Sequence, residues 1–133
     1  MTASGLSGAA DRDRKPTAID ETHLGRMTLG DRRLEREVLE IFVRQTAIML
    51  DRIMNAQPAL AAAAAHTLLG SARGIGAWRV ARAAERLEHA AAGEGGPADV
   101  EDAVTELKAA SLEASAAIGA RLGVLLAELA RER

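Results

Sequence analysis

The chain contains no cysteine among its 133 residues, which excludes disulfide bridges, thiolate metal ligands and thiol nucleophiles together. Aromatic residues are also scarce, since a single Trp and a single Phe make up 2% of the composition. Alanine supplies much of the 48% hydrophobic fraction. Such small side chains fill a core through close helix packing more readily than through a sheet. The composition therefore predicts an all-α protein.

A strong charge of one sign is missing as well. The 19 acidic and 17 basic residues are spread along the chain and give a formal net charge of -2, so no basic patch for nucleic acid is evident. The longest apolar run, residues 59–65, is too short to span a bilayer, and the N-terminus lacks the apolar stretch of a secretory signal. We therefore expect a cytoplasmic protein that binds neither nucleic acid nor a membrane.

The sequence predicts one domain preceded by a mobile N-terminal segment. Residues 1–18 combine low hydrophobicity, alternating charge and Pro16, a composition that predicts a mobile N-terminal segment. Residues 19–133 form the predicted folded domain. No internal repeat and no strand-like alternation interrupts it.

Capping residues and breakers divide that domain into helices. Asp31 is predicted to cap a long helix that runs to about residue 55, and Pro58 and Pro97 suit the first turns of later helices. Glycines at 74 and 76 and the stretch 93–96 are predicted to end helices. The expected helices are 21–27, 31–55, 57–73, 77–92 and 97–130. They predict an up-down-up-down four-helix bundle with a short extra N-terminal helix.

Apolar residues at helical spacing predict the core-facing positions. In the helix 31–55 the predicted inward stripe is Leu34, Val38, Ile41, Phe42, Ile48 and Met49. In the last helix the predicted inward positions are Val100, Val104, Leu107, Ala114, Ile118, Leu125 and Leu129.

His66 lies in the Ala-rich helix 57–73. A helical wheel places Leu60 and Leu68 on the inward face and small side chains beside His66. The residues on the His66 side are Ala59, Ala62, Ala63, Leu69, Gly70 and Arg73. We therefore expect an exposed imidazole on a surface with little bulk around it.

An imidazole that attacks an acyl phosphate on another protein needs a free nitrogen and a flat surround for in-line approach. Gly70, one turn after His66, removes a side chain that would crowd the ring. Arg73 is the only cation on this face that could stabilise a phosphoryl group. Its alternative role is an interaction with the helix dipole at the C-terminal end.

Residues 66–77, HTLLGSARGIGA, closely resemble the signature of bacterial histidine-containing phosphotransfer (HPt) domains, which read His-x-Leu-Lys-Gly-Ser-Ala followed by Ile or Leu, Gly and Ala. The resemblance extends to Phe42, Val80, Ala84, Leu87 and Glu88 and covers about residues 20–128. It implies a four-helix bundle with a phosphorylatable histidine on its second helix. His66 would be the phosphoryl acceptor, Gly70 the clearance residue, and Gly76 the residue that lets the next helix turn back.

One position departs from the family pattern, because Leu69 stands where members usually have Lys. Arg73 could replace the missing charge, the partner could supply it, or transfer could be slow. An apolar Leu69 could instead widen a docking surface formed by Ala59, Ala62 and Ala63.

The resemblance implies a monomeric phosphocarrier rather than an enzyme. It would move a phosphoryl group on His66 between aspartates of receiver domains, those of response regulators or hybrid histidine kinases, without an ATP-binding kinase domain or a cofactor of its own. Mg²⁺ would come from the receiver. No metal site is expected at His23 or His89, and Glu85 is expected to pair with His89. Two alternatives are a receiver-docking adaptor that is not phosphorylated and a dimerisation and phosphoacceptor fragment of a histidine kinase.

Overall fold

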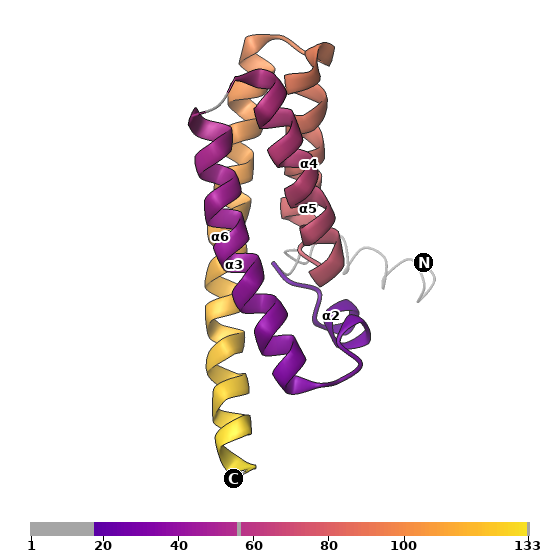
Figure 1. The fold of residues 1–133 in the computed structure, drawn as a ribbon, viewed down its shortest axis with the longest axis vertical. Helices are drawn as coiled ribbons and strands as arrows, with labels where there is room; N and C mark the ends of the chain where they lie inside the picture. The colour runs from indigo at the N-terminus through magenta and orange to yellow at the C-terminus, as the bar shows by residue number, and fades with distance from the viewer. Residues whose placement is uncertain (1–17, 56, 133) are drawn as a thin grey trace, which may run out of the picture.

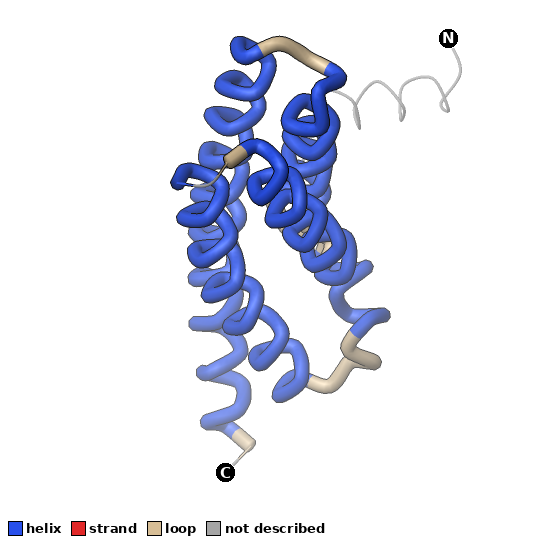
Figure 2. Tube along the Cα trace, turned by 45° about the horizontal axis from the view of Figure 1, so that its top comes forward, coloured by secondary structure: helices blue, strands red, loops and turns tan. Residues whose placement is uncertain are grey.

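The computed structural model describes residues 18–55 and 57–132, and this part of the chain is helical without a strand (Figure 2). The prediction of an all-α protein is confirmed. The helices are α2 (Glu21–Met27), α3 (Arg32–Asn55), α4 (Pro58–Ile75), α5 (Trp78–His89), a π-helical segment (Ala90–Glu94) and α6 (Pro97–Arg131). The predicted mobile segment, residues 1–18, lies outside the described residues except for Ala18.

The four longest helices alternate in direction along the chain (Figure 1). Helix α3 packs against α4 and α6, and α5 packs against the same two helices. Helix α4 therefore lies diagonally across from α6. Helix α2 packs against α4 near the end that leads into α5.

Helix starts follow the capping residues that the sequence suggested. The Asp31 carboxylate accepts hydrogen bonds from the backbone N–H of Arg33 at 2.9 Å and of Leu34 at 3.1 Å, which satisfies two free donors of the first turn. Pro58 and Pro97 each occupy the first turn of their helix. These three boundaries agree with the sequence analysis.

Gly76, rather than Gly74, ends helix α4. Gly74 stays inside the helix, whereas Gly76 adopts a left-handed conformation with φ of 83°. A Cβ at Gly76 would also lie 3.0 Å from the Asp20 Cβ. Asp20 donates its backbone N–H to the Gly76 carbonyl at 2.9 Å and accepts a hydrogen bond from Trp78 Nε1 at 2.9 Å. The Trp78 bond, together with the His23 amide, lowers the pKa of Asp20.

The predicted helix 77–92 is shorter than expected. It is α-helical only as α5, Trp78–His89, and continues as the π-helical segment Ala90–Glu94. Gly93 within that segment has φ of 96°, so the chain already turns there toward Gly96. The glycine-rich turn thus begins inside the last helical turn rather than after it.

The predicted inward stripe of α3 was partly wrong. Leu34, Ile41 and Ile48 are exposed. The side chains that α3 buries are those of Glu35, Leu39, Phe42, Thr46 and Ile53. A charged residue had not been expected in the core, but Arg121 Nε donates to Glu35 Oε2 at 2.6 Å. This ion pair satisfies the buried carboxylate and raises the pKa of Arg121.

Helix α6 runs unbroken through Gly119 and Gly123 over 35 residues. Its predicted inward residues Leu107, Ile118 and Leu125 are fully buried. By length and composition α6 could cross a membrane, and the sequence analysis had not singled out this stretch. Its inner face forms part of the bundle core, and core helices of soluble proteins meet the same criteria.

Candidate functional site

His66 projects from the middle of α4 with 72% of its side chain exposed. The expected exposure of the imidazole is therefore what the structure shows. The ring lies on the side of α4 that faces α5, because it contacts Glu88 of that helix.

The Nδ1 atom of His66 lies 2.8 Å from Oε2 of Glu88. A carboxylate can only accept a hydrogen bond, so Nδ1 carries the proton and donates it. No described residue is bonded to Nε2 of His66. The arrangement leaves Nε2 as the nitrogen that an external electrophile can reach.

The small residues that the helical wheel placed on the His66 side of α4 are accessible to solvent. Ala59, Ala63 and Gly70 are exposed, and Ala62 is half-buried. A Cβ added at Gly70 would meet no other atom within 4 Å. The bundle itself therefore does not require a glycine at this position, and the space above it is open to a partner.

The prediction for two leucines of α4 was wrong: Leu60 was expected to be buried and Leu69 to lie on the exposed His66 side. Leu69 is only 6% exposed, whereas Leu60 is 63% exposed. Helix α4 packs against both α3 and α5, so its buried arc extends round to Leu69 on the α5 side. Leu69 therefore lies in the core and does not widen a docking surface, whereas Leu60 is exposed.

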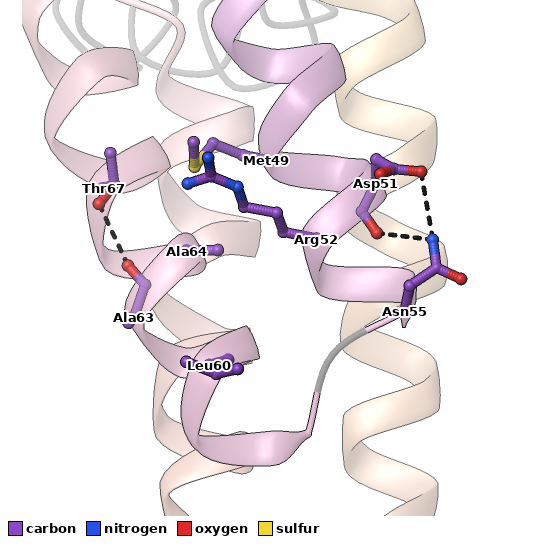
Figure 3. A pocket seen from close by; sticks show the side chains of 8 residues that line it. All are labelled: Met49, Asp51, Arg52, Asn55, Leu60, Ala63, Ala64 and Thr67. Atoms are coloured by element: carbon purple, nitrogen blue, oxygen red, sulfur yellow. Dashed lines mark hydrogen bonds between the residues drawn. The ribbon is translucent and has the colours of Figure 1, made fainter.

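A shallow groove follows the contact between α3 and α4 (Figure 3). Its lining residues are Met49, Asp51, Arg52, Asn55, Leu60, Ala63, Ala64 and Thr67. Because Ala63 belongs both to this groove and to the small-residue surface near His66, the two features are continuous.

A second hollow lies beside His66 between α4 and the end of α5. It is lined by His66, Leu69, Arg73, Glu85, Glu88, His89, Ala92 and Glu94. Arg73 thus reaches the same hollow as His66, but its Nη2 atom donates to Glu85 Oε2 at 2.6 Å. The candidate cation is engaged with a carboxylate of α5.

His89 forms an ion pair that the sequence analysis assigned differently. Its Nδ1 atom donates to Glu94 Oε2 at 2.7 Å, rather than to Glu85 one turn earlier. The hydrogen bond and charge of Glu94 raise the pKa of His89. His89 is 61% exposed, so the solvent screens this pair.

His23 contacts the C-terminal end of α4 and the start of α5. Its Nε2 atom donates to the Arg73 carbonyl at 2.9 Å, and its ring packs on Trp78 with centroids 4.8 Å apart. Among residues 18–55 and 57–132, no three His, Asp or Glu side chains gather as a metal would require.

Glu88 is the site residue that reasoning from spacing missed. It entered the sequence analysis only through the family resemblance, because no local pattern relates it to a histidine 22 residues away. Only the packing of α5 on α4 relates these residues, because it brings Glu85 and Glu88 toward the His66 face.

The fold and the site define an all-α domain that presents a histidine, held by a carboxylate at one nitrogen, on a face of small residues. The family model described as Hpt domain matches residues 37–131, and the chain belongs to this family. Membership implies a phosphotransfer role in phosphorelays, because Hpt domains are phosphocarriers that interact with receiver domains. No curated protein and no solved structure shows a significant match to the chain.

Proposed function

We propose that this protein is a phosphorelay intermediate that accepts a phosphoryl group on Nε2 of His66 and returns it to another protein. The observation that carries the proposal is the hydrogen bond from His66 Nδ1 to Glu88, which leaves Nε2 free on an open surface. The donor and acceptor partners are receiver domains of response regulators or hybrid histidine kinases.

In the proposed step, the Nε2 lone pair attacks the phosphorus of an aspartyl phosphate in the receiver. The P–N bond forms while the P–O bond to the aspartate breaks, and the carboxylate leaves with the electron pair. Positive charge develops on the imidazole as the new bond forms. Glu88 accepts from Nδ1–H and stabilises that charge, as a buried carboxylate does for a catalytic histidine. Mg²⁺ bound by the receiver supports the transferring group.

The hollow beside His66 determines how the phosphoryl charge is balanced. The carboxylates of Glu85, Glu88 and Glu94 line it, so an added dianion experiences repulsion. Arg73 and His89 lie in the same hollow. In our proposal Arg73 supplies the positive charge that family members place at the position of Leu69, and it does so by leaving or sharing Glu85.

The docking surface in this proposal consists of Ala59, Ala62 and Ala63 together with Gly70 and the neighbouring groove between α3 and α4. Small side chains allow a receiver to approach His66 closely, and Leu60 and Met49 of the groove add apolar area. The domain comprises residues 19–133 and acts in the cytoplasm, where receiver domains are found.

Transfer from a phosphorylated receiver tests the proposal. The wild type should acquire acid-labile label, and His66→Gln should acquire none. His89→Gln is a matched control, because His89 is similarly exposed and also donates Nδ1–H to a glutamate. It should still acquire label, because His66 is intact. Receiver binding without labelling of the wild type, across several competent receivers, would instead support the non-phosphorylated docking adaptor.

A further inference from the structure

An apolar stripe runs along the solvent-facing side of α6. Its members recur at alternating spacings of three and four residues, the period of a helix-packing seam. They are Ala109, Leu112, Ala116, Gly119, Gly123, Leu126 and Ala130, called here the outer stripe. All seven are exposed, and the two leucines expose 74% and 51% of their surface. None of the seven residues is charged, although charged residues make up 27% of the chain.

Contacts within the described chain do not explain why glycine occupies positions 119 and 123 of the outer stripe. A Cβ at Gly119 or Gly123 would meet no other atom within 4 Å, and both have ordinary negative φ values, since they are absent from the positive-φ glycines of the described chain. A glycine in the middle of a helix is less favourable than alanine. Close approach of a second helix would account for both positions, since it needs backbone without side chains.

We propose that the outer stripe is a dimer interface on which α6 of a second copy packs in the antiparallel direction. In size, the side chains of the outer stripe are complementary to those of the same stripe in a second copy. In an antiparallel pair, residue numbers rise along one helix and fall along the other. One such register places Leu112 opposite Gly123 of the second copy and Leu126 opposite Ala109. The same register places Ala116 opposite Gly119. Each leucine then fills the space left by a small residue. A parallel pair would place leucine on leucine and glycine on glycine.

Charge at the start of α6 favours the same direction. The start of α6 is acidic, with Asp99, Glu101 and Asp102, whereas its last turns are mixed, with Arg131 between Glu128 and Glu132. An antiparallel pair keeps the two acidic starts apart, and it opposes the two helix dipoles. A parallel pair would align the acidic turns with each other.

The proposed dimer leaves both phosphoryl sites accessible. His66 lies on α4, which is diagonal to α6 in the bundle, so the outer stripe faces away from it. The assembly would present two His66 sites on opposite sides. The inference replaces the monomer expected from the sequence and does not depend on the proposed phosphotransfer.

Sedimentation equilibrium of the full chain over a wide concentration range tests the interface. The wild type should approach twice the chain mass of 13.9 kDa as concentration rises. Leu112→Glu and Leu126→Glu should each remain monomeric. Val124→Glu is the matched control, because Val124 is 49% exposed on the same helix but lies off the stripe; it should dimerise like the wild type. Circular dichroism verifies that each variant is folded.

A wild type that stays monomeric throughout, or a dimer that both stripe variants retain, would overturn the proposal. Cysteine cross-linking tests the direction, because the native chain has no cysteine. A mixture of Ala109→Cys and Leu126→Cys chains should form a disulfide-linked heterodimer. Ala109→Cys alone should not, since the two copies of residue 109 would lie about 25 Å apart. Efficient cross-linking of Ala109→Cys alone would contradict the antiparallel arrangement.

Discussion

At the scale of residues, the proposed phosphoryl transfer depends on the pair formed by His66 and Glu88. One imidazole nitrogen is bound by a carboxylate and the other is free, so the side chain is oriented before a partner arrives. The pair depends on two helices, and its geometry therefore reports on the packing of α5 against α4.

Glu88→Gln should slow phosphoryl transfer to His66 by about tenfold. Glutamine can still accept from Nδ1–H, but it lacks the charge that stabilises the developing cation. A hydrogen bond to a charged group contributes about 1.5–3 kcal/mol, and exposure of this pair favours the lower end, which corresponds to about tenfold in rate. Single-turnover transfer from a phosphorylated receiver measures the effect. Glu94→Gln removes the matching partner of His89 and one carboxylate of the hollow beside His66, so it should not slow transfer.

Gly70→Ala should stabilise the fold and impair transfer at the same time. The gain should be about 0.8–1 kcal/mol, because alanine is the better helix former and its Cβ meets no atom within the chain. Urea unfolding measures the stability, and single-turnover transfer measures the rate. Unchanged transfer in both Gly70→Ala and the bulkier Gly70→Leu would show that no partner approaches this part of α4 closely.

At the scale of helices, the corner between α4 and α5 joins three elements. Gly76 provides the left-handed turn, its carbonyl accepts from Asp20, and Asp20 in turn binds Trp78 at the start of α5. Helix α2 is held against the end of α4 through these contacts and through His23. The corner therefore fixes the direction in which α5 leaves, and with it the position of Glu88.

Gly76→Ala should destabilise the fold by at least about 1–2 kcal/mol. Alanine is strained in the left-handed region, and its Cβ would crowd Asp20. Gly74→Ala provides the control, since Gly74 is helical and a Cβ there has open space; it should stabilise slightly. Urea unfolding compares the two variants. Equal stability of both would contradict the role given to Gly76.

Helix positions were the part of the fold that the sequence could predict well. Asp31, Pro58 and Pro97 act through local backbone geometry, so their effects are readable from neighbouring residues. The buried face of α3 was harder, because Glu35 is buried only through an arginine 86 residues away. A pattern that counts apolar side chains assigns such a carboxylate to the solvent.

On the scale of the whole molecule, the bundle separates two surfaces. The face with His66, Ala63 and Gly70 lies on α4, and the outer stripe lies on α6 across the core. The sequence predicted the small residues near His66, since they share its helix. It could not predict which leucine of α4 is buried or which carboxylate binds His66, because both depend on how α5 packs.

The central claim is that Nε2 of His66 carries the phosphoryl group. The most direct measurement is to locate the label after transfer from a phosphorylated receiver, by peptide mass spectrometry for the residue and by NMR for the nitrogen. We expect a single phosphohistidine, at His66, with phosphorus on Nε2 and the proton retained on Nδ1. Label on His89 or His23, or on Nδ1 of His66, would contradict the account.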